Sequence, residues 1–288
     1  MSIKRILCPL YGSASDAASL TMGLSLAKRF HAQADILFVR PNPTDALPYL
    51  GEGISGPVVE DIIETARKAA DSAEDQCRKE AEEAARAAGV EITDEVRADA
   101  ATARMRIKSG RAVDVIAGES RLADLVIVAD AGARDQASGP NALETCMLAE
   151  GRPVLLAPQQ APADVGASVV IGWDESGEAA NAITAAMPFL VSAEEVTIVC
   201  VDEDGVSDAP GARALQEYLA LHTVTAEIHL VPEDNRNTGE VLLAEATNLQ
   251  GDLLVMGGYS HSRLRELVLG GVTRHIRSHA TIPVLMAH

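Results

Sequence analysis

The residues with the clearest chemical potential form a polar segment bracketed by two glycine pairs, residues 257–273. Gly257 and Gly258 follow an aliphatic run, and Gly270 and Gly271 precede a helical pattern. Glycine lets the backbone approach a ligand closely, and the unsatisfied first N–H groups of a helix can hold a phosphate without net positive charge. The spacing predicts an anion-binding loop. The alternative is that the glycines only allow tight turns and bind no ligand.

Polar side chains within the same segment can add to such a site. Ser260 and Thr273 supply hydroxyl groups, and Arg263 and Arg265 supply positive charge. His261 could touch a phosphate, although histidines in loops are usually solvated. Because no Lys precedes the Ser or Thr, the segment is not a complete P-loop.

No catalytic residue and no metal site are predicted. The sequence has no Ser-His-Asp ordering and no G-x-S-x-G motif, and efficient hydrolysis of ATP would need a positioned base and a metal-binding carboxylate. His275 and His279 have the i, i+4 spacing of metal ligands, but no nearby Glu or Cys completes a set. Histidines near a helix C-terminus are commonly favourable partners of the helix dipole.

The elements that must position these residues occur twice along the chain. Three patterns of the first half return in the second half in the same order: 6–13 at 169–176, 123–128 at 251–256, and 152–157 at 282–287. Each half alternates strand and helix patterns, which is typical of a parallel sheet with helices on both faces. The sequence therefore predicts two tandem Rossmann-like α/β domains, residues 1–159 and 165–288, each with a five-stranded parallel sheet.

The expected elements can be placed by residue number. The predicted strands cover residues 3–9, 34–40, 103–108, 124–129 and 153–157, then 168–173, 195–201, 224–231, 252–256 and 282–287. The predicted helices cover residues 14–30, 57–88, 111–121 and 139–150, then 176–190, 209–221, 238–250 and 271–279. Such sheets bind ligands at the carboxyl ends of their strands. Asp174 stands at one of these ends, where it can both cap the next helix and contact a ligand.

The glycine-rich segment resembles the signature of the universal stress protein family, in which Gly, two residues, Gly, nine residues and Gly precede Ser or Thr. The four signature positions fall on Gly257, Ser260, Gly270 and Gly271, so two are kept and two are changed. The resemblance covers nearly the whole chain twice over. It implies a Rossmann-like fold and a loop that cradles the phosphates and ribose of ATP.

The same resemblance implies roles for residues outside the loop. Asp174 would help to hold the nucleoside, and Val201, at the end of the second strand of its half, would line the adenine pocket. Val272 and Thr273 match the residues that follow the last signature glycine. Because Ser260 has a Cβ, the loop must avoid positive φ there, so weaker or altered nucleotide binding is expected.

The first half lacks most of these features. Ala129 and Asp130 stand in place of the first glycine pair, no glycine pair opens the next helix, and Tyr11 replaces the Asp at the end of the first strand. The carboxylate of Asp130 would repel phosphate. We expect a partner domain without nucleotide, whose strand 153–157 pairs with strand 282–287. This pairing would make one chain a pseudo-dimer and would cover two sheet edges.

The composition of the chain restricts the kinds of partner and the cellular compartment that we expect. The formal net charge of -18 opposes binding to nucleic acid and to anionic membranes. The four cysteines form no C-x-x-C pair, which favours a reducing compartment over a disulfide framework. With neither a signal-peptide pattern nor a long apolar run in the sequence, we expect a cytoplasmic protein.

Three functions remain open on this evidence. The first is a stress-response regulatory protein that binds ATP or a related adenine nucleotide, with or without Mg, in its second domain. The second is a nucleotide-free module that binds protein partners and carries a vestigial site. The third is a slow ATPase, which the lack of an evident base disfavours. Protein partners and further homodimerisation are left open.

Overall fold

The computed structural model describes residues 2–13, 15–42, 56–129, 142–162, 164–202, 209–232, 236–259 and 271–288. In the first half the strands are β1 (Arg5–Leu10), β2 (Gln33–Arg40), β3 (Glu91–Ile92), β4 (Thr102–Ser109), β5 (Leu125–Ala129) and β6 (Val154–Ala157). In the second half they are β7 (Ser168–Gly172), β8 (Glu195–Asp202), β9 (Glu227–Pro232), β10 (Leu253–Gly257) and β11 (Val284–Ala287).

Helices connect these strands. In the first half they are α1 (Asp16–Phe30), α2 (Gly56–Ala88), α3 (Ala112–Ser120) and α4 (Ala142–Glu144), which runs on into a π-helical turn (Thr145–Ala149). In the second half they are α5 (Gly177–Leu190), α6 (Pro210–Leu221), α7 (Thr238–Asn248) and α8 (Gly271–His279). The predicted strands and helices are therefore present. The structure adds the short strand β3 and a π-helical turn at the end of α4.

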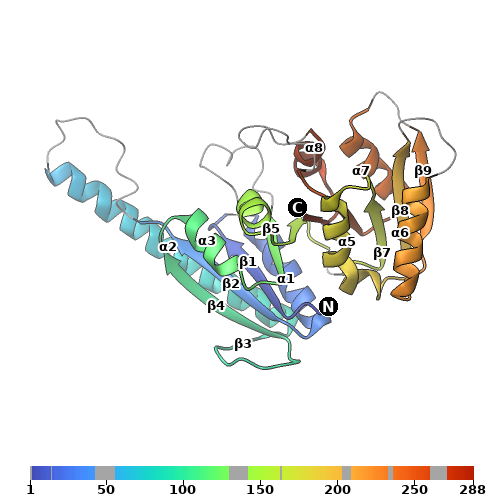
Figure 1. Cartoon of the computed structure of the whole chain (residues 1–288). Coiled ribbons are helices and arrows are strands. Elements are labelled where there is room, and N and C mark those ends of the chain that lie inside the picture. Colours follow the sequence, from blue (N-terminus) through green and yellow to red (C-terminus); the bar gives the residue numbers. More distant parts are fainter. Residues whose placement is uncertain are drawn as a thin grey trace.

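One eleven-stranded sheet runs through the whole molecule (Figure 1), in the order β3-β4-β2-β1-β5-β6-β11-β10-β7-β8-β9. Within each half all the strand pairs are parallel, and the order apart from β3 is the same in both. The predicted pair of Rossmann-like halves is confirmed. The domain limits 1–159 and 165–288 stay a prediction.

The two halves meet at β6 and β11, the one antiparallel pair among the described strands. Val154 lies opposite Met286, and Leu156 lies opposite Val284. The predicted pairing of these strands is confirmed, and the chain forms a pseudo-dimer whose central edges are both covered.

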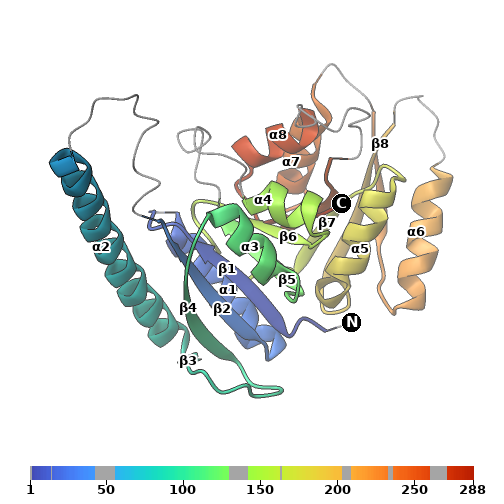
Figure 2. The same ribbon diagram turned by 60° about the vertical axis from the view of Figure 1, so that its left-hand side comes forward.

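Two hydrophobic cores fill the two faces of the sheet. One packs α1, α2, α5 and α6 on one face, and the other packs α3, α4, α7 and α8 on the opposite face (Figure 2). The strands contribute side chains to both faces, which is why they read as continuous aliphatic runs. No helix in the described part of the chain is long and apolar enough to cross a membrane.

Matching aspartates fix the start of the first strand in each half. The Asp124 carboxylate accepts hydrogen bonds from the backbone N–H groups of Lys4 and Arg5, at 2.8 and 2.9 Å. The Asp252 carboxylate accepts from Gly166, Ala167 and Ser168 at 2.8–3.1 Å. Both aspartates precede the fourth long strand of their half, so the repeat extends to individual side chains.

A buried ion network stabilises the outer strands of the first half. Asp35 on β2, with a fully buried side chain, accepts hydrogen bonds from Arg5 at 2.7 Å and Arg104 at 3.1 Å. Arg106 joins the network through Glu119 of α3, at 2.7 Å. Burial alone would raise the pKa of Asp35, but the hydrogen bonds from Arg104 and the charge of Arg5 outweigh it and lower that pKa.

Candidate functional site

Seven of the ten predicted site residues lie in the part of the chain that the structure describes. They are Asp174, Val201, Gly257, Gly258, Gly271, Val272 and Thr273. They stand at the carboxyl ends of β7, β8 and β10 and in the first turn of α8, as parallel strands require. Ser260, His261 and Gly270 lie outside the described residues.

The two ends of the glycine-rich segment are tied together. The backbone N–H of Tyr259, just after β10, donates to Oγ1 of Thr273 in α8 at 3.4 Å. Thr273 is buried, and Tyr259 has a left-handed backbone with φ of 66°. The Thr273 hydroxyl thus holds the segment closed at its base, while its proton remains available to a further acceptor.

Gly257 is required by helix packing. A Cβ at this position would lie 2.7 Å from the backbone nitrogen of Ala179 and 3.1 Å from the Cβ of Glu178, both in the first turn of α5. Neither contact can be relieved by a side-chain movement alone. The absence of a side chain here lets the start of α5 reach the end of β10.

Gly258 faces the first half. A Cβ there would lie 2.7 Å from the terminal methyl group of Met147, which belongs to the π-helical turn after α4. The Gly258 N–H donates to the carbonyl of Ala287 at 2.9 Å, and its own carbonyl lies 3.1 Å from Nδ1 of His288. The first half therefore contributes Met147 beside Gly258, at the end of β10.

Asp174 is exposed and lies at the turn between β7 and α5. Its Oδ1 accepts from the backbone N–H of Ser176 at 3.0 Å and from the Ser176 hydroxyl at 2.6 Å. The Ser176 hydroxyl oxygen in turn accepts from Ala179 N–H, as an N-cap. The second carboxylate oxygen of Asp174 has no partner among the described residues and is available to a ligand.

Glu175 was missed by the sequence reasoning. It has a left-handed backbone with φ of 60°, and its carboxylate lies against the start of α6, 2.0 Å from where a Cβ of Gly211 would stand. A carboxylate near a helix N-terminus is favourable. Burial first, and Glu175 second, raise the pKa of Cys200 to about 11. The Glu175 carboxylate thus lies against the start of α6, next to the end of β7.

Val201, Gly271 and Val272 complete the described set. Val201 is half-buried at the end of β8 and packs against the core formed by α3, α4, α7 and α8. Gly271 is exposed at the first position of α8. Val272 is half-buried and packs on the same core as Val201.

The corresponding turn of the first half is filled from within. The backbone N–H groups of Tyr11, Gly12 and Ser13 donate to Oδ2 of Asp16 at 2.8, 2.7 and 3.2 Å, and the Ser13 hydroxyl donates to Oδ1 at 3.0 Å. Asp16 is only 1 % exposed. Ser15, at the N-cap position of α1, makes no side-chain capping bond, and the Asp16 carboxylate binds the N–H groups of the preceding turn.

The histidine pair on α8 shows a packing contact. The rings of His275 and His279 stack with centroids 4.2 Å apart, and Nδ1 of His279 lies 2.9 Å from the carbonyl oxygen of His275. In the described ranges no group of three or more His, Cys, Asp or Glu side chains is arranged to hold a metal ion.

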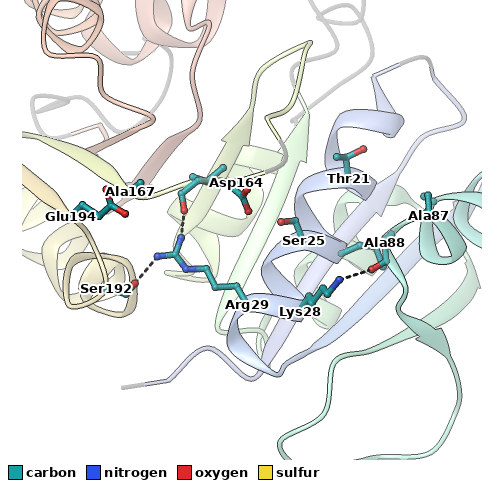
Figure 3. A pocket seen from close by; sticks show the side chains of 13 residues that line it. Thr21, Ser25, Lys28, Arg29, Ala87, Ala88, Asp164, Ala167, Ser192 and Glu194 are labelled. Atoms are coloured by element: carbon teal, nitrogen blue, oxygen red, sulfur yellow. Dashed lines mark hydrogen bonds between the residues drawn. The ribbon is translucent and has the colours of Figure 1, made fainter.

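A groove of about 850 Å³ lies at the opposite ends of the strands, between the halves (Figure 3). Arg29 of α1 crosses it and donates to the carbonyl of Val165 and, at 2.6 Å, to the Ser192 hydroxyl. Lys28 donates to the carbonyl of Ala88 at 3.3 Å. These cations hold the linker and α2, so the groove is a structural seam between the halves.

Comparisons with known proteins agree with this geometry. The sequence pattern of the universal stress protein family matches residues 167–288, which include every predicted site residue. The second half of the chain belongs to the universal stress protein family. This membership supports a stress-response role. No curated protein matches the sequence.

Solved structures extend the likeness to both halves. A universal stress protein from Archaeoglobus fulgidus DSM 4304 is 17 % identical, with a TM-score of 0.70 over 98 % of this chain and 97 % of that chain. A functionally unknown protein from Pseudomonas aeruginosa PAO1 is 12 % identical, with a TM-score of 0.57 over 98 % and 92 %. At these identities the likeness shows that the tandem universal stress protein fold is shared.

Proposed function

We propose that the second half binds ATP or a related adenine nucleotide at the carboxyl ends of β7 and β10, and that the chain is a regulatory protein of the stress response. The observation that carries the proposal is the open turn at Asp174. Among the described residues this turn leaves one carboxylate oxygen of Asp174 without a partner, whereas the matching turn of the first half is filled by Asp16.

The phosphates would lie at the start of α8. Gly271 is exposed at the first position of α8, and the Tyr259–Thr273 contact holds the two ends of the segment within reach of each other. A helix N-terminus binds anions through its N–H groups and dipole, which suits a chain of net charge -18. Asp174 is the candidate carboxylate for the Mg that accompanies ATP.

The nucleotide-free alternative is favoured by a specific observation. Packing alone accounts for Gly257 and Gly258, whose missing side chains make room for α5 and Met147. The signature glycine Gly257 and its neighbour Gly258 would therefore persist in a protein that binds no nucleotide and uses its surface for protein partners. No comparable observation favours a slow ATPase.

Calorimetric titration of ATP with magnesium separates the two candidates. We expect saturable binding to the wild-type protein and at least a tenfold loss in Gly270→Asp, which places a carboxylate at the phosphate position. Gly118→Asp is the matched control, because Gly118 lies on α3 of the first half with open space around it. Equal binding by all three proteins, or none by the wild type up to about millimolar ATP, would contradict the proposal.

A further inference from the structure

The beginnings of α7 and α8 lie against each other. A Cβ on Gly239, in the first turn of α7, would stand 3.0 Å from the carbonyl oxygen of Val272 and 3.2 Å from the Cβ of His275, both on α8. Gly239 is buried in this contact. The lack of a side chain at Gly239 therefore brings the start of α7 up to the start of α8, where the proposed phosphate site lies.

The side-chain amide of Asn237 has a fixed orientation at this junction. Asn237 is the N-cap of α7, and its Oδ1 accepts a hydrogen bond from the backbone N–H of Gly239 at 2.8 Å. Because the amide oxygen is committed to the helix, the NH2 group is the part that faces Gly271. Its Nδ2 lies 3.3 Å from the place that a Cβ on Gly271 would occupy, and it makes no hydrogen bond within the described ranges.

This amide lies where a side-chain donor is missing. Gly271 stands at the position that is Ser or Thr in the universal stress protein signature, so this chain has no hydroxyl there. A hydroxyl on residue 271 would be carried by the same Cβ whose place lies 3.3 Å from Nδ2 of Asn237. The N–H donor is thus about one hydrogen-bond length from where the missing side chain would begin. Both residues are exposed.

A neutral donor suits this place better than the field of the helix does. Glu240, also in the first turn of α7, carries a negative charge that opposes the positive end of the helix dipole. An anion must therefore be held here by hydrogen bonds at short range. The amide NH2 group supplies N–H donors without adding charge, and hydrogen bonds to an ionised acceptor such as phosphate are the stronger kind.

We propose that the Asn237 amide is a phosphate-binding group of the second half, which donates to the nucleotide from α7 in place of a hydroxyl on residue 271. This assignment rests on the proposed nucleotide site and adds to it a residue from a second helix. The contact selects for the phosphorylated ligand, because a nucleoside without phosphate has nothing for this amide to bind.

Asn237→Asp and Asn237→Gly test the assignment in calorimetric titrations with ATP and magnesium. Asp keeps the shape and the N-cap but replaces the N–H donor with a carboxylate oxygen, and Gly removes the donor without adding charge. We expect the ATP dissociation constant to rise roughly tenfold in Asn237→Gly and further in Asn237→Asp. Asn248→Asp, the same change about 16 Å away at the exposed end of α7, should leave it unchanged.

Two further measurements separate a ligand contact from a capping role. The affinity for adenosine should be the same in wild type and both variants, and an equal loss for adenosine and ATP would contradict the assignment. Gly271→Ser in the Asn237→Gly background supplies a hydroxyl from the other helix and should recover most of the lost ATP affinity. A double variant that binds no better than Asn237→Gly would show that the two groups do not reach the same phosphate.

The outcomes also distinguish this assignment from the proposed function. If the wild type binds ATP, Gly270→Asp abolishes binding and both Asn237 variants bind as the wild type does, the role of Asn237 is overturned and the nucleotide site stands. If the wild type binds no ATP, both are overturned. Urea unfolding checks that the variants fold, and its midpoint should stay close to that of the wild type, since Asp and Gly are both accepted as N-caps.

Discussion

The turns after the first strand of each half have a similar backbone shape, but their polar groups differ in whether a ligand could reach them. Gly12 and Glu175 occupy matching left-handed positions, with φ of 71° and 60°. In the first half three backbone N–H groups converge on the buried Asp16 carboxylate, whereas in the second half Asp174 is exposed and one of its oxygens has no partner within the described ranges. Fold similarity thus leaves open which half can take a ligand, because a single buried carboxylate is enough to occupy the N–H groups of such a turn.

The largest expected difference between the halves lies in their outer strands. Asp35→Asn removes the charge that Arg5 and Arg104 surround, and should lower the free energy of unfolding by about 3 kcal/mol. The comparison in the second half is Glu245→Gln, which breaks the partly exposed pair between Glu245 of α7 and His229 of β9 at 3.1 Å. This substitution should lower the free energy of unfolding by at most about 1 kcal/mol. Urea unfolding at neutral pH measures both.

The pH dependence of the same variant sharpens this comparison. Because the folded state lowers the pKa of Asp35, its contribution is present above the unfolded pKa and is lost as the pH falls through the folded pKa. The difference in stability between wild type and Asp35→Asn should therefore shrink on acidification from neutral pH. A difference that stays constant down to the acid limit would show that packing of Asp35 matters more than its charge.

An intermediate effect is expected at the two first-strand turns. Asp16→Ala leaves three N–H groups without their acceptor and should cost about 2 kcal/mol. Asp174→Ala removes an exposed carboxylate and should cost less than about 1 kcal/mol, while weakening ATP binding. Denaturant titrations with and without nucleotide measure both. An equal loss of unfolding free energy in the two variants would contradict the distinction between a filled and an open turn.

The smallest effect concerns the left-handed positions of these turns. Gly12→Ala fits sterically, 3.6 Å from the Cβ of Ala73, but adopts a disfavoured φ and should cost about 1 kcal/mol. Glu175→Gly relieves the same strain and loses a carboxylate near α6, so stability should change by less than about 0.5 kcal/mol. Thermal unfolding checks both variants. A larger loss for Glu175→Gly would mean that its contact with α6 outweighs the backbone strain.

The sequence predicted the sheet well because the central strands β1, β5, β7 and β10 are buried on both faces and carry nearly uninterrupted aliphatic runs. It missed β3, since two residues, Glu91 and Ile92, are too short to show a periodic pattern. It also missed the Asp35 network, although Arg104 and Arg106 alternate along β4 on the face of that carboxylate.

The site was predicted less completely than the fold. Positions at strand ends follow from topology, so Asp174 and Gly257 could be placed from the repeat. The structural reason for a glycine depends on neighbours distant in sequence, here Ala179 for Gly257 and Met147 for Gly258. Likewise, Asp16 looks like an ordinary residue of a helix start, and only the path of the preceding turn shows that its carboxylate collects that turn's N–H groups.

The antiparallel pair of β6 and β11 has a consequence for the order in which the molecule is made. Among the described strands β11, at the middle of the sheet, is synthesised last, although its neighbour β6 was completed long before. At about 5–20 residues per second, the unpaired edge of β6 waits roughly 6 to 25 seconds for its partner. During that interval the nascent chain presents an open strand edge at its centre, which chaperones or neighbouring nascent chains can reach.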